Sequence, residues 1–251
     1  MRFSKIALGV GLAAAAMFTA AQAATFTADY RHEYRSEYGE NFDRICLIGA
    51  FENGIGFYVD SSFKSGSERP NAGTDTLPDG YSEGQEGDFV TNATEMSLWW
   101  GYKVPGTGFT ITPGVITEST SETTGYKPYL RLQYNTDFGL WFAIRPRYDY
   151  WRYDNEKADQ KNGRIDAWVG YSYGNFGINY NYTYMWALND NADGSTRVMF
   201  DNDDNNYEQN LSMNYRLGKW NPYIEFGDIS VAGNRDDRQL RLRVGIQYTF
   251  D

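Results

Sequence analysis

The chain has 251 residues but only one cysteine, Cys46, and one histidine, His32. A single cysteine cannot form an internal disulfide, even in an exported protein, where disulfides are common. A reactive cysteine needs a base or a cation beside it, and a chain with one histidine offers little choice of partner. Cys46 is therefore predicted to fill space within a strand, and no catalytic thiol is expected.

Long hydrophobic runs are also missing beyond the N-terminus. No stretch of about 18 consecutive apolar residues follows residue 23, which excludes a helical membrane protein. The N-terminus has a basic start, an apolar run over residues 6–21 and the small-residue sequence Ala21-Gln22-Ala23. This order is typical of a cleaved secretory signal peptide. We predict a signal peptide at residues 1–23 and a single domain at residues 24–251.

Positive charge is scarce. The chain has 23 Lys and Arg against 33 Asp and Glu, and its net charge of −10 becomes −12 once Arg2 and Lys5 leave with the signal peptide. This sign argues against nucleic acid as a partner. Mean hydropathy is only −0.62, although 17% of residues are aromatic. A barrel strand exposes half its residues to lipid, which reconciles low hydropathy with a membrane location, but a soluble β-sandwich could share this composition.

What the chain does contain is a repeated alternation of apolar and polar residues. In residues 239–250, QLRLRVGIQYTF, the large apolar residues fall on one face at period two and both arginines fall on the other. One apolar and one charged face suit a strand of a membrane-spanning barrel. Twelve segments alternate in this way, near residues 25–34, 42–51, 55–63, 93–103, 109–118, 126–135, 140–151, 164–173, 176–186, 207–217, 221–228 and 238–250.

The links between these segments alternate in length. Every second link is short and rich in Gly, Asn or Pro, as in tight turns: residues 52–54, 104–108, 136–139, 174–175 and 218–220. The remaining links are polar and mostly longer, and the longest is 64–92. Outer-membrane barrels have short periplasmic turns and long extracellular loops. We therefore predict an all-β, single-chain antiparallel transmembrane β-barrel of about twelve strands in a Gram-negative outer membrane.

The alternation also separates the aromatic residues. Tyr180, Tyr182 and Tyr184 share the outward face of one segment, as expected of the girdles that hold a barrel at its depth in the bilayer. Ordinary packing in a soluble sheet would also explain these rings, but it would bury the inward charges in a core. Three inward aromatic residues could stack on sugar rings or only fill space: Tyr129, Trp141 and Trp168.

Most of the chemistry lies on the inward face. The candidate pore-lining residues are cations of inward parity: Arg31, Arg44, Lys127, Arg131, Arg145, Arg147, Arg164, Arg216, Arg241 and Arg243; Lys103 shares this parity. One group, on the sixth and seventh segments, is Arg131, Arg145 and Arg147. A second group, on the twelfth and first segments, which become neighbours when the sheet closes, is Arg31, Arg241 and Arg243.

In a twelve-stranded barrel these two groups lie half a circumference apart and would face each other as two basic ladders. Guanidinium groups bind carboxylates through paired hydrogen bonds, and a narrow lumen strengthens their field. A linear polyanion could pass by moving its carboxylates from one arginine to the next, provided that each site binds weakly. Wall networks are the alternative, because acidic residues share the inward parity: Asp29, Glu33, Asp60, Glu95, Glu118, Asp149, Asp166, Glu208 and Glu225.

Two parts of the sequence resemble a known family. They are DYRHE at residues 29–33 and the C-terminal run that contains WNPY at 220–223, FGD at 226–228, DRQ at 237–239 and YTF at 248–250. The chain resembles the oligogalacturonate-specific monomeric porins, a family that also contains the sialic acid channel. The resemblance covers essentially the whole mature chain. It implies a twelve-stranded monomeric channel for acidic sugars with two facing tracks of basic side chains, among them Arg31 and the arginines of the last strand.

One departure from the family lies at the C-terminus. Family chains usually end on the terminal aromatic residue, whereas Asp251 follows Phe250 here. The effect of this extra residue on recognition by the barrel assembly machinery stays open. Lipid and lipopolysaccharide of the outer membrane are the other expected partners.

An enzymatic barrel is poorly supported. Barrel phospholipases need a Ser–His pair on the outer wall, and barrel proteases need acidic residues with a histidine at the mouth. His32 faces outward, and no serine on the second or last segment lies beside it with matching parity. We predict no enzymatic activity and no cofactor.

Calcium is the only metal that the sequence suggests. Residues 189–194, NDNADG, mimic the start of a calcium loop, but Phe200 stands where the closing glutamate belongs. The acidic residues 201–204 could attract a divalent ion that bridges to lipopolysaccharide, or they could form a solvated loop. No metal site is predicted.

These observations together predict a passive, anion-selective diffusion channel for acidic oligosaccharides such as oligogalacturonate or related uronate oligomers. A sialic acid channel or a general small-anion porin is the alternative within the same class. A structural barrel without specific transport is the alternative from another class, and an eight-stranded barrel would favour it because eight strands leave no aqueous passage. The sequence does not decide which sugar passes or whether the 64–92 loop folds into the lumen.

Overall fold

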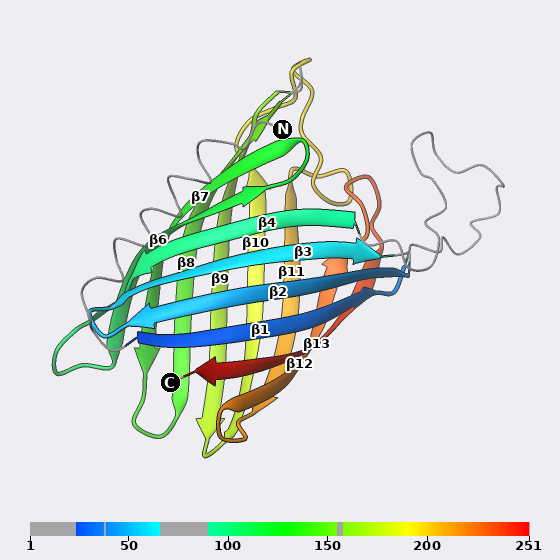
Figure 1. Cartoon of the computed structure of the whole chain (residues 1–251). Coiled ribbons are helices and arrows are strands. Elements are labelled where there is room, and N and C mark those ends of the chain that lie inside the picture. The colour runs from blue at the N-terminus through cyan, green and yellow to red at the C-terminus, as the bar shows by residue number, and fades with distance from the viewer. Residues whose placement is uncertain (1–23, 38, 66–89, 155–157, 251) are drawn as a thin grey trace, which may run out of the picture.

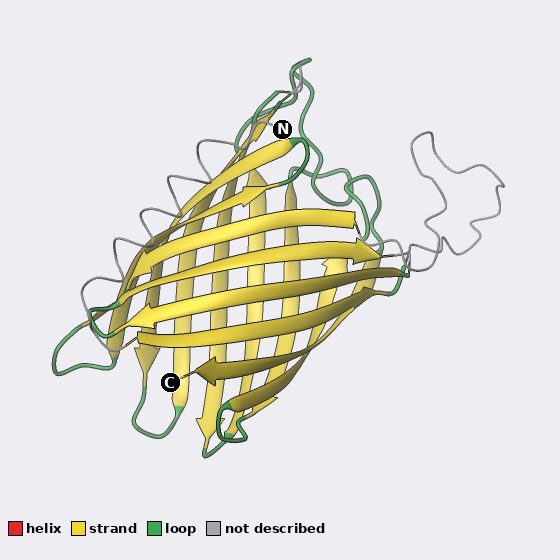
Figure 2. Cartoon of the chain, viewed as in Figure 1, coloured by secondary structure: helices red, strands yellow, loops and turns green. Residues whose placement is uncertain are grey.

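The computed structural model describes residues 24–37, 39–65, 90–154 and 158–250, and this part of the chain is built from antiparallel strands (Figures 1 and 2). The strands are β1 (Ala24–Arg35), β2 (Glu40–Phe51), β3 (Ile55–Ser65), β4 (Val90–Trp100), β5 (Tyr102–Lys103), β6 (Phe109–Ser119), β7 (Thr123–Asn135), β8 (Leu140–Tyr153), β9 (Gln160–Tyr173), β10 (Phe176–Ala187), β11 (Asn205–Tyr215), β12 (Trp220–Ser230) and β13 (Arg238–Phe250). Among the described residues, none forms a helix that is long and apolar enough to cross a membrane.

The sheet closes on itself. Apart from β4 and β5, each strand pairs with its sequence neighbours, and β1 also pairs with β13 from Phe26–Phe250 to Arg35–Arg241. Both β4 and β5 pair with β6, so they form one barrel strand interrupted at Gly101. The predicted twelve-stranded antiparallel β-barrel is therefore confirmed. Figure 1 shows β1 beside β13 across the seam, with the strands inclined along the wall.

The turns between strands agree with the predicted pattern of short and long links. Gly54, Gly139, Gly174 and Gly218 all lie in short links with positive φ, which side chains other than glycine rarely adopt. At Gly54 a Cβ atom would also lie 2.2 Å from the backbone oxygen of Gly101. These turns gather at the end of the barrel that contains the β1 start and the β13 end, so this end is periplasmic.

Strand parity sorts the side chains as predicted. On β10, Tyr180, Tyr182 and Tyr184 are each 38% exposed on the outer face, whereas Thr183 on the inner face is fully buried. The outer face of the described barrel is thus apolar and aromatic, and the inner face is polar and charged. A soluble sandwich would bury the apolar face and expose the charged one, which is the reverse of this arrangement.

Glycines in the wall are covered by aromatic rings from neighbouring strands. A Cβ atom on Gly170 would lie 2.3 Å from the Trp141 ring, and one on Gly114 would lie 2.4 Å from the Tyr129 ring. One side of each ring is therefore occupied by the wall. Of the three inward aromatic residues considered from the sequence, Tyr129 and Trp141 cover wall glycines in this way, whereas Trp168 contacts arginines.

Three sequence predictions concern residues outside the described part of the chain. They are the signal peptide at residues 1–23, the conformation of most of the 64–92 loop, and the effect of Asp251 on assembly.

Candidate functional site

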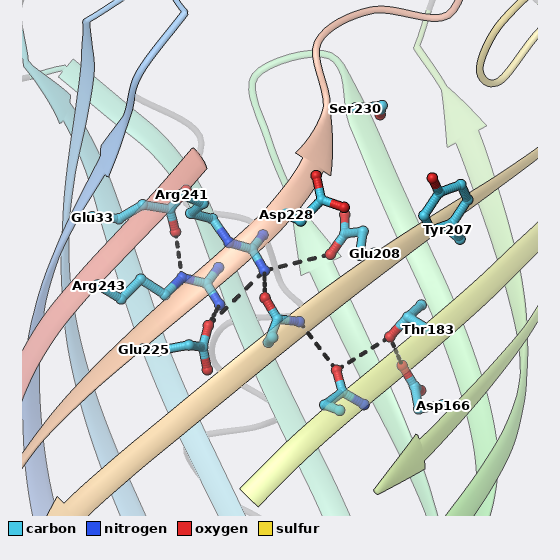
Figure 3. A network of polar contacts seen from close by, with 12 residues as sticks. Glu33, Asp166, Thr183, Tyr207, Glu208, Glu225, Asp228, Ser230, Arg241 and Arg243 are labelled. Carbon is cyan, nitrogen blue, oxygen red and sulfur yellow. Dashed lines mark hydrogen bonds and ion pairs between the residues drawn. The ribbon is translucent and has the colours of Figure 1, made fainter. Parts of the chain in front are cut away.

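The lumen contains a dense ionic cluster on β13, β12 and β1. Arg243 donates from Nε to Glu33 and from a terminal nitrogen to Glu225, both at 2.7 Å. Arg241 donates to Asn210 at 2.7 Å and lies 3.5 Å from Glu208. Both arginines come from the inward face of the last strand, and Figure 3 shows them pointing toward these carboxylates. Two of the predicted pore-lining arginines are thus held by the wall.

A second ionic cluster lies on β8 and β9. Asp166 is completely buried and accepts hydrogen bonds from Arg145 at 3.0 Å and from Arg164 at 2.8 Å. Arg147 binds Asp149 through two hydrogen bonds of 2.6 Å each. This paired geometry is the strongest that an arginine and a carboxylate form. Three further predicted cations are therefore paired with neighbouring carboxylates.

Neutral side chains connect the two clusters through β11 and β10. Asn210 donates to Asn181 at 3.1 Å, and the Thr183 hydroxyl lies 3.4 Å from Asn181 and donates to Asp166 at 2.7 Å (Figure 3). The chain of contacts thus runs along the wall from β13 to β9. The sequence prediction missed these residues because it considered charged side chains only, although the same parity places Asn181, Thr183 and Asn210 inward.

Thr183 gives a direct test of this network. Replacing Thr183 by valine keeps the shape of the side chain but leaves a buried carboxylate oxygen of Asp166 without its hydroxyl donor. We expect the free energy of unfolding to fall by about 1–3 kcal/mol. Urea titration in detergent micelles, followed by tryptophan fluorescence, measures this change. Thr110→Val, on the inward face of β6, is the matched control and should change stability little.

The wall formed by β2, β3, β4, β6 and β7 carries further ion pairs. Arg44 lies 2.5 Å from Asp29 and 3.5 Å from Asp60. Lys127 pairs with Glu118 and lies 3.5 Å from Glu95, which also accepts a hydrogen bond from the Tyr58 hydroxyl. Most inward cations are therefore paired with carboxylates of the wall. This is the alternative to the two ladders that the sequence analysis left open.

Two inward arginines differ from the rest. Arg31 on β1 comes no closer than 3.9 Å to Glu33, and its buried Nε has no hydrogen-bond partner. Arg131 on β7 stacks over Trp168, with 5.1 Å between its guanidinium carbon and the ring centroid, and its Nε is also buried without a partner. Within the described residues, neither guanidinium donates a hydrogen bond to a carboxylate. Both thus keep capacity for an external anion.

The sheet order puts these two arginines on opposite walls. Between β1 and β7 lie the barrel strands β2, β3, β4 with β5, and β6. Arg31 also borders a cavity of about 300 Å³ in the lumen, together with Arg243, Arg44, Glu95 and Glu118. Facing charges in a confined aqueous space create a strong local field, because the low-dielectric wall focuses it.

Other predicted or overlooked cations lie at the barrel ends. Arg216 follows the end of β11, is exposed, and donates its backbone N–H to the Asn175 carbonyl at 2.8 Å, so it lies at the periplasmic mouth. Lys103 is also exposed near that end. The sequence prediction missed Arg35, which donates to Glu33 at 2.8 Å, although its parity is inward.

The loop between β10 and β11 uses its polar groups internally. Arg197 is buried, which lowers the pKa of its guanidinium, and it donates to Asn189 at 3.1 Å and to the Lys161 carbonyl at 3.0 Å. Hydrogen bonds from Ser195 lower the pKa of the Asp193 carboxyl. Within the described residues, no group of three or more His, Cys, Asp or Glu side chains is placed to hold a metal ion.

A closed antiparallel barrel with a lipid-compatible outer face and a charged, cavity-containing lumen defines a porin-type channel of the outer membrane. A family model for the oligogalacturonate-specific porin protein (KdgM) matches residues 17–250. This chain belongs to that porin family, as its sequence resemblance predicted, and it is an outer-membrane channel.

The chain is also similar to individual proteins and solved structures. The oligogalacturonate-specific porin KdgM of Dickeya dadantii is 32% identical over 244 residues, which cover 94% of this chain and 97% of that protein. The uncharacterized protein YiiY of Salmonella typhimurium is 31% identical over 223 residues, which cover 88% of this chain and 89% of that protein. The NanC porin structure has the same fold, with a TM-score of 0.68 at 19% identity, over 88% of this chain and 98% of that structure.

Proposed function

We propose that this porin is a passive, anion-selective channel for acidic oligosaccharides, with uronate oligomers as its substrates. The observation that carries the proposal is the pair Arg31 and Arg131, whose guanidinium groups have no carboxylate at hydrogen-bonding distance in the described wall. A sugar carboxylate would supply the missing acceptor on either side of the lumen. KdgM, a relative over nearly the whole chain, is by its name specific for oligogalacturonate.

The arginines that are paired with wall carboxylates have a supporting role in this proposal. Arg145 pairs with Asp166 and also lies 5.3 Å from the Tyr129 ring and 5.2 Å from the Trp168 ring. Its position next to Arg131 keeps local positive charge high without a second unpaired group. A ladder of fully unpaired arginines would bind a polyanion tightly, whereas two unpaired arginines among neutralised ones allow weak binding and release, as conduction requires.

The proposal extends to assembly and partners. The channel works as a monomer, with the substrate passing through a single barrel, and needs no cofactor and catalyses no reaction. Residues 1–23 are removed as a signal peptide, and the barrel assembly machinery inserts the mature chain into the membrane.

Block of single-channel current by uronate oligomers tests the proposed substrate class. With the refolded mature chain in a planar bilayer, trigalacturonate should interrupt the current in brief, concentration-dependent events, because its carboxylates bind Arg31 and Arg131 transiently. A neutral oligosaccharide of equal length, such as maltotriose, should cause at least tenfold fewer events at the same concentration. Sialic acid as the stronger blocker would favour the alternative substrate, and equal block by the neutral sugar would contradict recognition of charge.

A further inference from the structure

The outer face of the barrel has a groove of about 480 Å³ that the channel function does not use. It is lined by Tyr126, Pro128, Tyr148, Tyr150 and Lys161. These residues come from the extracellular ends of β7, β8 and β9, all with outward parity. The groove contains one ammonium group among three tyrosine rings, and this combination is unlike the purely apolar surface below it.

Strand pairing brings these residues together. Tyr150 pairs with Tyr126 on one side and with Lys161 on the other, and the two tyrosine rings are stacked with centroids 6.3 Å apart. One row below, Tyr148 pairs with Gly163. The Trp186 ring of β10 covers Gly163, where a Cβ atom would lie 2.2 Å from it, so the groove lies on the β7 and β8 side of Lys161.

The position of the groove along the barrel axis can be estimated from β9. Lys161 and Tyr171 are ten residues apart on the same outward face, with Ile165 and Val169 between them. At about 3.3 Å per residue and a tilt of about 40°, they are separated by roughly 25 Å along the barrel axis, the height of the apolar band of a membrane barrel. Tyr171 lies two residues before the periplasmic end of β9, so Lys161 lies at the outer interface, where lipid phosphates lie.

The charges at this interface are largely available. Within the described part of the chain, no carboxylate comes within 4 Å of the Lys161 amine or of the Arg152 guanidinium, and both side chains are exposed. Asp159 is the nearby acidic group, and the hydrogen bond that it accepts from the Tyr150 hydroxyl lowers its pKa. This bond also holds the Tyr150 ring in place.

The backbone of Lys161 is fixed as well. Its N–H donates to the Asn189 side chain at 2.7 Å, and its carbonyl accepts from the Leu188 N–H at 2.8 Å and from Arg197 at 3.0 Å. The loop between β10 and β11 therefore holds the backbone of Lys161 at the rim of the groove.

We propose that this groove binds the phosphorylated glucosamine headgroup of lipopolysaccharide in the outer leaflet. The phosphate is bound by Lys161, with Arg152 as a second cation, and the sugar and the first acyl carbons lie against the tyrosine rings. The contact is direct, without a bridging divalent ion. It goes beyond the channel function and does not depend on it.

Native mass spectrometry of the refolded mature chain with lipid A, the phosphorylated anchor of lipopolysaccharide, tests the proposal. Lys161→Ala should weaken lipid A binding about fivefold, the effect expected for one cation at a lipid surface. Lys219→Ala, which removes a cation from the periplasmic turn, is the control and should bind as the wild type does. Dephosphorylated lipid A should bind the wild type as weakly as lipid A binds Lys161→Ala.

Single-channel conductance of Lys161→Ala, expected to equal that of the wild type, verifies that the variant barrel is folded. Equal lipid A binding by Lys161→Ala and the wild type would overturn the proposal. Loss of wild-type binding in EDTA would overturn it too, because binding would then depend on a divalent ion.

Discussion

Replacing Arg243 by alanine is expected to destabilise the folded barrel by about 3–5 kcal/mol, because Glu33 and Glu225 would lose the guanidinium that they share. Glu33 is only 4% exposed, and its contacts with Arg243 and Arg35, at 2.7 and 2.8 Å, are the shortest of its ion pairs. Water reaches Glu33 too poorly to replace the lost partner. Urea unfolding in detergent micelles, followed by tryptophan fluorescence, measures the loss.

A second variant separates the ionic effect from simple loss of packing. In Arg243→Ala with Glu225→Gln, the carboxylate whose nearest remaining cation, Arg241, lies 3.9 Å away is neutralised while the size of its side chain is kept. This double variant should recover a substantial part of the lost stability. If Arg243→Ala unfolds within 1 kcal/mol of the wild type, the arginine is not held by the wall as described.

Replacing both Arg31 and Arg131 by serine should lower the ratio of anion to cation permeability roughly tenfold while leaving the barrel folded. Each charge, acting on an ion about 12 Å away in a water-filled lumen, favours an anion by about 0.35 kcal/mol and disfavours a cation by about the same amount, which changes the permeability ratio about threefold. Stability should change little, because neither arginine donates a hydrogen bond to a carboxylate among the described residues. Reversal potentials in a salt gradient measure the change in selectivity.

The matched control for this variant removes an ion pair without changing the charge of the lumen. Arg147→Ser combined with Asp149→Asn eliminates a guanidinium and the carboxylate that binds it at 2.6 Å. Selectivity should stay near that of the wild type. If the control shifts the reversal potential as much as the Arg31 and Arg131 variant does, unpaired arginines are not the source of selectivity.

The paired arginines are expected to respond differently. Replacing Arg241 together with Arg243 also removes positive charge, but among the described residues it leaves Glu208 and Glu225 without an ion-pair partner. A change in selectivity should therefore come with a loss of stability. This difference distinguishes arginines that hold the wall from arginines that are available to substrate.

Alternation of residue type was sufficient to predict the barrel. A period of two determines which side chains face lipid, and Gly-rich turns mark the strand ends, so the twelve segments agree with the strands to within a few residues. The largest difference in bounds is at β9, which starts at Gln160 instead of 164, but the difference that matters for the site is on β11, which ends at Tyr215. The predicted segment continued to residue 217 and therefore placed Arg216 on the wall instead of at the mouth.

Pairing within the lumen could not be predicted in the same way. Parity puts Arg31 and Arg243 on the same inner surface, but the contact that each makes depends on the register of neighbouring strands and on long, flexible side chains. Glu33 lies opposite Arg243 across the β1–β13 seam, which explains why Arg243 rather than Arg31 binds it closely. The role of Thr183 could not be predicted either, because it follows from its position beside Asp166 on the adjacent strand.

The reversal potential of the wild-type channel in a planar bilayer, under a potassium chloride gradient, is the most direct test of the central proposal. The sign should correspond to preferred passage of chloride, with conductance steps of a single size as expected for one pore per monomer. Preferred passage of potassium would contradict the proposal, because it would mean that the carboxylates of the wall outweigh Arg31 and Arg131.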